Sequence, residues 1–159
     1  MSKNILVPVD GSEVSFKALD YAIDVAKTYG AALVITNVVI PYNFSVVEMK
    51  KTGREAHELD YSQFKVTKED KKGEVTDGAD NYILRAAKKR ATKHGYDGFT
   101  CRQVVDVNPA HAIVEQAKAL KSDLIVIGNR GMGELVQIVL GSISTKVVSS
   151  AECPVVIIK

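Results

Sequence analysis

Apolar residues form five short runs along the chain, separated by segments with a helical spacing. The runs are Ile5–Val9, Ala32–Ile40, Thr100–Val107, Asp123–Gly128 and Val155–Ile158. Most are continuous and rich in β-branched residues, which is typical of strands covered on both faces in a parallel sheet. The third run, TCRQVVDV, is more mixed and indicates a partly exposed face. The pattern predicts a sheet of buried strands.

The first two segments between these runs predict amphipathic helices. The first follows Ser12, ends at Gly30, and has one apolar stripe formed by Phe16, Leu19, Ile23 and Ala26. The second extends from about Glu74 to His94 and is more basic. Its inward positions are Ala79, Ile83, Ala86 or Ala87, and Ala91. Both patterns have the period at which a helix buries one side.

Two further helices complete the alternation of strands and helices. The third has Asn108 as its cap and Pro109 at its first position, and its apolar residues are Ile113, Ala117 and Leu120. The fourth follows Gly141 and Ser142, turns Ile143, Val147 and Val148 inward, and ends before Pro154. Strands that alternate with helices require right-handed crossovers and a parallel sheet with helices on both faces. The predicted class is therefore α/β, with ligands bound beyond the carboxyl ends of the strands.

One long charged stretch, at about residues 42–73, interrupts this order. It has too few apolar residues for a core of its own, although Val46–Leu59 has the pattern of a short helix. We therefore expect one domain over residues 1–159, with this stretch as a variable insertion. The insertion is interpreted as solvated, and the alternative is an ordered lid or partner surface, because long loops are often functional.

Charge and cysteine content narrow the class of protein. The 21 Lys and Arg residues nearly balance the 19 Asp and Glu residues, which argues against a nucleic-acid coat. No apolar run is long enough for a membrane span, and the first residues lack the pattern of a secretion signal. Cys101 and Cys153 have no metal-type spacing, and His57, His94 and His111 form no ligand pair. We expect a cytoplasmic protein with no catalytic or metal-binding residue of its own.

Glycine is concentrated after the fourth strand, at Gly128, Gly131, Gly133 and Gly141. Gly128 ends the strand where a side chain would block a ligand, and Gly131 permits a positive φ or a close backbone approach. Gly141 and Ser142 open a helix whose N–H groups and dipole attract anions. Hydroxyl groups of Ser142 and Ser144 and the guanidinium of Arg130 are suited to phosphate. The segment therefore predicts a polyphosphate site.

Neither of two common phosphate motifs accounts for this segment. The chain has no G-x-x-x-x-G-K-[ST], and Gly128, Gly131 and Gly133 form G-x-x-G-x-G rather than G-x-G-x-x-G. The spacing G-x2-G-x9-G-S does occur, together with the opening ILVPVDGSE and the ending CPVVIIK. In these three features the chain resembles the universal stress protein family, in its ATP-binding branch.

The resemblance implies a Rossmann-like fold of the adenine nucleotide alpha hydrolase-like type. It implies a single open five-stranded parallel sheet with helices on both faces and strand order 3-2-1-4-5. The implied ligand is ATP, or AMP or ADP, with Mg²⁺ on the phosphate oxygens. By resemblance, Asp10 would bind the ribose, Pro8 and Val38 the adenine, and Ile127 and Gly128 the ribose side. The phosphates would contact Arg130, Gly131, Gly141, Ser142, Ile143 and Ser144.

Two departures from the family pattern are visible. The turn before the third predicted helix is Val107-Asn108-Pro109 instead of Gly-Asp-Pro, and Asn108 is expected to preserve it by capping. Gly133 is additional and is expected to change nucleotide affinity. Asp10 also has a simpler interpretation, because Asp-Gly-Ser-Glu is a good helix start.

The resemblance implies a nucleotide-dependent regulatory or stress-response module. The alternative function is a slow ATPase or an autophosphorylating enzyme that uses the same site, although no general base is evident. An adenylate-transferring enzyme is disfavoured because the chain lacks His-x-Gly-His and Ser-Gly-Gly-x-x-Ser. The resemblance also implies a homodimer paired through Val155–Ile158, and an unknown protein partner. We expect no nucleic-acid or membrane partner.

Overall fold

The computed structural model describes residues 3–40, 75–79, 81–129 and 140–159. Within them lie six strands and four helices. The strands are β1 (Asn4–Pro8), β2 (Ala32–Val39), β3 (Val75–Thr76), β4 (Phe99–Val105), β5 (Leu124–Gly128) and β6 (Val155–Ile158). The helices are α1 (Glu13–Tyr29), α3 (Tyr82–Lys93), α4 (Pro109–Ala119) and α5 (Ser142–Ser150).

The strands form one sheet in the order β3-β4-β2-β1-β5-β6. All neighbours are parallel except β3, which pairs antiparallel with β4 through Val75 with Val104 and Thr76 with Gln103. The prediction of five strands was therefore wrong, because the short edge strand β3 is a sixth. The five parallel strands without β3 have the predicted order 3-2-1-4-5, and the α/β class is confirmed.

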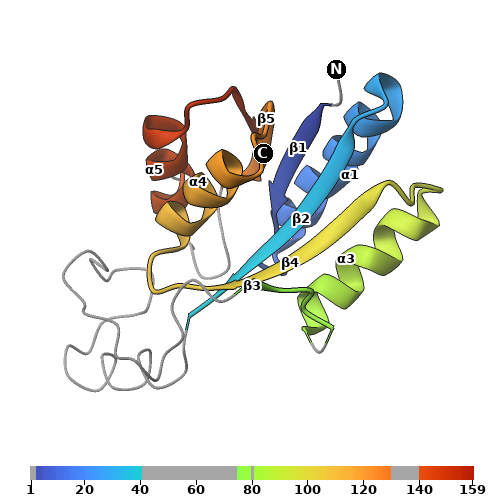
Figure 1. Ribbon diagram of the computed structural model, residues 1–159, viewed down its shortest axis with the longest axis horizontal. Helices are drawn as coiled ribbons and strands as arrows, with labels where there is room; N and C mark the ends of the chain where they lie inside the picture. Colours follow the sequence, from blue (N-terminus) through green and yellow to red (C-terminus); the bar gives the residue numbers. More distant parts are fainter. Residues whose placement is uncertain (1–2, 41–74, 80, 130–139) are drawn as a thin grey trace.

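Helices cover both faces of the sheet (Figure 1). On one face α1 and α3 pack in a core that includes Leu19, Ile23 and Leu84, all 0% exposed. On the other face α4 and α5 pack in a second core with Ile113 and Val147. Strands β1 and β5 between these layers are buried except at their first residues, as continuous β-branched runs predict, whereas β4 is partly exposed.

The predicted ends of three helices agree with the structure. In α1, Ser12 Oγ accepts from the backbone N–H of Ser15 at 3.2 Å, and Gly30 ends the helix with φ 60°. In α4, Asn108 Oδ1 accepts from the N–H of His111 at 3.1 Å, and Pro109 is the first helical residue. Helix α5 follows Gly141 and ends before Pro154. Capping by Ser12 and Asn108 determines where α1 and α4 begin, whereas α5 starts without a side-chain cap.

Two predictions about helices were wrong. The second predicted helix begins at Tyr82 instead of about Glu74, because Asn81 caps it and Val75 joins the sheet. Ile143 and Val148 on α5 are 37% and 45% exposed instead of inward. The inward positions of α5 are Ser144 and Val147, three residues apart, and Ser144 is buried because backbone carbonyls accept its hydroxyl.

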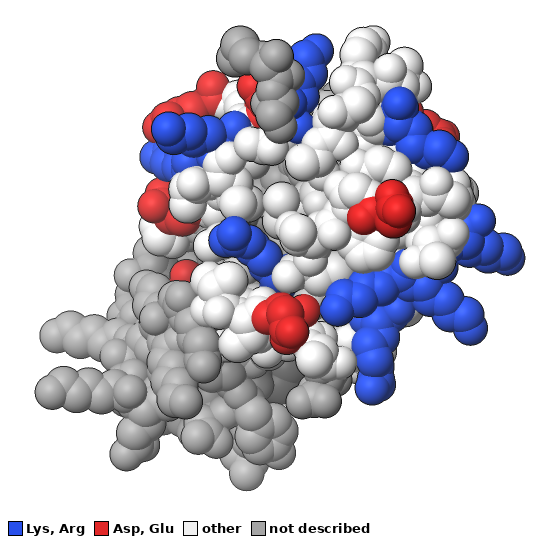
Figure 2. Space-filling model, turned by 45° about the vertical axis from the view of Figure 1, so that its right-hand side comes forward, with Lys and Arg blue, Asp and Glu red and all other residues white. Residues whose placement is uncertain are grey.

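The insertion at 42–73 lies outside the described residues, together with the helix expected at Val46–Leu59. In the described part of the chain, no helix has the length and apolar character needed to cross a bilayer. On the face of the molecule in Figure 2, acidic and uncharged side chains separate groups of Lys and Arg, which agrees with the small net charge of +2.

Candidate functional site at the carboxyl ends of the strands

Strand order reverses beside β1. The chain passes from β1 to β2 on one side, whereas β5 lies on the other side of β1. In open α/β sheets the crevice at such a reversal, beyond the carboxyl ends of the strands, is the usual ligand site. Leu6 pairs with Ile125, the last pair between the two parallel strands, and β1 and β5 then end at Pro8 and Gly128 at the same edge of the sheet.

The loop after β1 is folded around the Asp10 carboxylate. Asp10 Oδ1 accepts from the backbone N–H of Ser12 at 2.9 Å and from Ser12 Oγ at 2.6 Å. Gly11 between them has φ 90°, a conformation that side chains disfavour. Ser12 in turn caps α1. Asp10 thus shapes the helix start, as the simpler interpretation expects, and stands directly at the edge of the predicted crevice.

Gly128 at the end of β5 lies against the first turn of α1. A Cβ at this position would be 3.0 Å from Val14 Cγ1 and 3.3 Å from the backbone nitrogen of Ser15. Gly128 is also buried. The close approach of strand and helix is therefore one physical reason for glycine here, in addition to the ligand access inferred from the sequence.

Asn129 connects the end of β5 to the start of α5. Its carbonyl accepts from the N–H of Gly141 at 2.6 Å and from Ser144 Oγ at 3.0 Å, while its N–H donates to Ile158 O at 2.7 Å. Gly141 has no side chain with which to cap α5. The N-terminal ends of α1 and α5, on opposite faces of the sheet, therefore both meet the end of β5.

Nine of the eleven predicted site residues can be located. Pro8, Asp10, Val38, Ile127 and Gly128 lie at or just past the carboxyl ends of β1, β2 and β5. Gly141, Ser142, Ile143 and Ser144 form the first turn of α5. Ser142 and Ile143 are exposed, whereas Gly141 and Ser144 are buried. Arg130, Gly131 and the additional Gly133 lie outside the described residues.

The family model of the universal stress proteins matches residues 1–159 of the chain. The chain belongs to the universal stress protein family. Universal stress protein YxiE of Bacillus subtilis is 35% identical over 162 residues, which span 100% of both chains. Universal stress protein MJ0531 of Methanocaldococcus jannaschii is 33% identical over 157 residues, spanning 99% of this chain and 82% of the relative.

Solved structures of the family share this fold. A universal stress protein in complex with cAMP is 26% identical, with a TM-score of 0.64 over 99% of this chain and 96% of the other. A universal stress protein from Archaeoglobus fulgidus in complex with dAMP is 19% identical, with a TM-score of 0.62 over 100% of this chain and 98% of the other. At the lower identity, the likeness concerns the fold alone.

Sequence reasoning missed a buried polar group beside the site of this universal stress protein. Asn37 is 5% exposed in the middle of the apolar segment ALVITNVV of β2. Its side chain bonds to the carbonyl of Val9 and to Asn81 at the start of α3. An asparagine in a strand that is otherwise apolar is itself a signal, because a buried amide requires partners.

A second missed residue, Asp106, lies just past the end of β4. It is 5% exposed, its Oδ1 accepts from the N–H of Asn108 at 2.9 Å, and its Oδ2 is 3.9 Å from Nδ1 of His111. The carboxylate thus shapes the turn in which this chain departs from the Gly-Asp-Pro pattern. In the described ranges, no three His, Cys, Asp or Glu residues form a cluster able to hold a metal ion.

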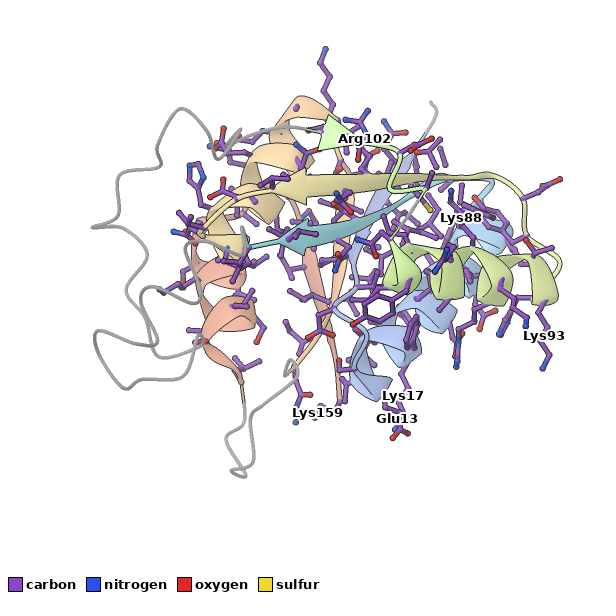
Figure 3. The ribbon with its side chains drawn as sticks, turned by 90° about the horizontal axis from the view of Figure 1, so that it is seen from below. Glu13, Lys17, Lys88, Lys93, Arg102 and Lys159 are labelled. Carbon is purple, nitrogen blue, oxygen red and sulfur yellow. The ribbon has the colours of Figure 1, made fainter. Side chains whose placement is uncertain are left out.

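Other reactive or charged groups lie on the faces of the helices and strands. Burial raises the pKa of the Cys101 thiol; the charge of Lys88 lowers this pKa by less, and the charge of Asp77 raises it slightly further. Burial also raises the pKa of the Cys153 thiol. Figure 3 shows Lys88 and Lys93 on α3. Asp20 on α1 accepts two bonds of 2.6 Å from Arg90, and His94 is 3.3 Å away from it. Asp20, Arg90 and His94 thus join α1 to the C-terminal end of α3.

Proposed function

We propose that this universal stress protein binds ATP, or else AMP or ADP, and acts as a cytoplasmic, nucleotide-dependent module of the stress response. The observation that carries the proposal is the meeting of two helix N-termini at the end of β5, beside the reversal of strand order. Gly128 contacts α1, and Asn129 holds the start of α5. Helix N-termini favour anions, and ligands of open α/β sheets usually bind where the strand order reverses.

The nucleoside end of the site is supported by the residues around β1 and β2. Val38, which packs against the apolar cluster on the α4 and α5 face, would flank the adenine together with Pro8, and Ile127 of that cluster would line the ribose side. Asp10 provides carboxylate oxygens at the mouth of the same crevice, and carboxylates accept hydrogen bonds from ribose hydroxyls. The solved family structures in complex with cAMP and dAMP hold ligands that share an adenine base and one phosphate.

The phosphate end is supported by the first turn of α5. This nine-residue helix starts without a side-chain cap, and its Ser142 is exposed. The Ser144 hydroxyl is buried against the Asn129 and Gly141 carbonyls, so that residue would act through its backbone and by holding the turn. Arg130 and Gly131 would complete the phosphate contacts. Mg²⁺ would neutralise phosphate oxygens, since no acidic cluster among the described residues offers a separate cage.

The exposed edge of the sheet supports a homodimer. Strand β6 is last in the strand order, and each of its four residues, Val155–Ile158, is partly exposed. An apolar edge strand favours association unless it is covered. A second copy that pairs through β6 across a two-fold axis would cover it.

Calorimetric titration with ATP and Mg²⁺ tests the binding proposal directly. Asp10→Asn keeps an oxygen that accepts from Ser12 and removes the charge, so it should weaken ATP binding by about tenfold while α1 still forms. Asp24→Asn, which makes the same change of charge on the exposed side of α1, is the matched control and should bind normally. Equal affinities for ATP in Asp10→Asn and Asp24→Asn would exclude the proposed role of Asp10.

A further inference from the structure

Three amide side chains link the end of β1 to the start of α3. Asn37 Nδ2 donates to the carbonyl of Val9 at 2.7 Å. Asn81 Nδ2 donates to Asn37 Oδ1 at 2.8 Å and to Gln103 Oε1 at 2.8 Å. The link therefore connects β1, β2, α3 and β4 at the carboxyl end of the sheet.

Backbone groups at both ends fix the direction of this chain of hydrogen bonds. Asn81 Oδ1 accepts from the N–H groups of Ile83 and Leu84, at 3.0 and 3.1 Å, and these groups only donate. The Asn81 amide must therefore turn its nitrogen toward Asn37, which presents its oxygen. Asn37 must then turn its own nitrogen toward the Val9 carbonyl, which only accepts.

The hydrogen bond from Asn37 to the Val9 carbonyl also restrains Asp10, the next residue of the chain. Backbone pairing of β1 with β2 ends near Pro8 and Thr36, and the N–H of Val9 donates to Thr36 O at 2.8 Å. The Val9 carbonyl lies in the same planar peptide unit as the nitrogen of Asp10. The hydrogen bond from Asn37 fixes this peptide unit, which is one unit beyond the backbone pairing of β1 with β2. It thereby fixes the backbone orientation at Asp10 and the direction of the Asp10 side chain.

We propose that Asn37 is a positioning residue that orients Asp10 toward the ribose hydroxyls, with Asn81 holding Asn37 in place. This inference rests on the proposed function and deepens it. Asn37 acts through the Val9–Asp10 peptide and does not touch the nucleotide. Recognition of the two ribose hydroxyls therefore depends on a chain of amide side chains that runs from the buried Asn37 to Asn81, the cap of α3.

The test compares affinity for ATP with affinity for dideoxy-ATP, whose sugar lacks both hydroxyls. The wild-type protein should prefer ATP by about tenfold, as expected for hydrogen bonds to a charged acceptor. Asn37→Leu removes the amide at similar volume and should reduce that preference by about threefold or more. Thr36→Val is the matched control: Thr36 is 0% exposed, and its hydroxyl has no hydrogen-bond partner among the described residues.

A second variant separates positioning from folding. Asn81→Asp keeps the oxygen that caps α3 but replaces the donating nitrogen with an oxygen that faces Asn37 Oδ1 and Gln103 Oε1. It should also reduce the preference for ATP over dideoxy-ATP, with helical content unchanged by circular dichroism, and it decides the matter if Asn37→Leu does not fold.

The outcomes distinguish the two proposals. If Asn37→Leu or Asn81→Asp folds and loses the preference while Thr36→Val keeps it, the inference is supported. If the wild-type protein prefers ATP and the folded variants keep the same preference, Asn37 does not position Asp10, and the proposed function survives. If the wild-type protein does not bind ATP, the proposed function itself is overturned.

Discussion

Several residues for which a binding role is proposed also have a structural role in this protein. Asp10 holds Ser12 and thereby the start of α1, and Gly128 lets β5 approach the same turn. Ser144 uses its hydroxyl to hold the first turn of α5. These three residues, which the resemblance also assigns to the nucleotide, have structural contacts of their own, so substitutions must be chosen to separate the two roles.

Gly128→Ala tests the structural role of the glycine at the end of β5. The added methyl group would crowd Val14 Cγ1 at 3.0 Å, so the free energy of unfolding should fall by about 1–3 kcal/mol. Urea denaturation measures this loss. Val14→Ala in the Gly128→Ala background removes the crowding atom and should recover part of the stability. If the free energy of unfolding does not recover, the loss in Gly128→Ala does not come from the contact with Val14.

The raised pKa of the Cys101 thiol predicts how the rate of its chemical labelling depends on pH. Burial raises the pKa of Cys101 in the folded chain above its ordinary value of 9.0, so the folded state keeps a proton that the unfolded state releases. Stability from this group is complete below the ordinary pKa and declines as pH rises through the folded value. In Cys153→Ser, labelling of Cys101 by a thiol reagent should therefore still accelerate above about pH 9. A rate that levels off below the ordinary pKa would contradict this prediction.

At the scale of elements, α1 and α3 are joined by a forked contact between Arg90 and Asp20. Both bonds measure 2.6 Å, and the guanidinium also lies 5.6 Å from the ring of Phe16. By contrast, Glu13 and Lys17 on α1 form an exposed pair at 3.3 Å (Figure 3). The first contact joins two helices, whereas the second joins successive turns of one helix.

Arg90→Lys should lower the free energy of unfolding by about 1 kcal/mol, because a lysine keeps the charge but loses the fork. Glu13→Gln breaks the exposed pair and should cost less than about 0.5 kcal/mol. Chemical denaturation of both variants makes the comparison. Equal losses would show that the contact between α1 and α3 contributes no more than a surface ion pair.

Elements whose signals are local could be predicted from the sequence. Helix ends could be predicted from residues that cap, start or terminate helices, namely Ser12, Gly30, Asn108 and Pro109. The buried strands could be predicted from their continuous apolar runs. The start of α3 could not be predicted in the same way. Pairing of Val75 with β4 is a tertiary contact with no signature of its own in a two-residue strand.

The candidate site was predictable as far as its glycines and strand ends. The resemblance supplied its residues, and the strand ends bring together those that the structure describes. The linked amides Asn37 and Asn81 escaped prediction because their role depends on neighbours far along the chain: the two residues are 44 positions apart. The exposure of Ile143 and Val148 also escaped, since apolar type alone does not decide which side of a short helix faces the core.

At the scale of the whole molecule, the two edges of the sheet differ. The short strand β3 pairs antiparallel at one edge, whereas β6 leaves a partly exposed apolar strand at the other. We predict a dimer through β6. Size-exclusion chromatography with light scattering at micromolar concentration should give the mass of two chains. The mass of one chain would overturn the dimer and leave the nucleotide site as proposed.

Analysis of the nucleotide that co-purifies with the protein tests the central claim most directly. The purified protein is denatured, the released nucleotide is identified and counted by chromatography, and a parallel sample is incubated with Mg²⁺ for hours. We predict ATP in a fixed ratio to the chain, held intact as a regulatory module requires. Steady turnover of the bound ATP would favour the enzyme instead. A protein that carries no nucleotide and gives no heat of binding with added ATP would contradict the account.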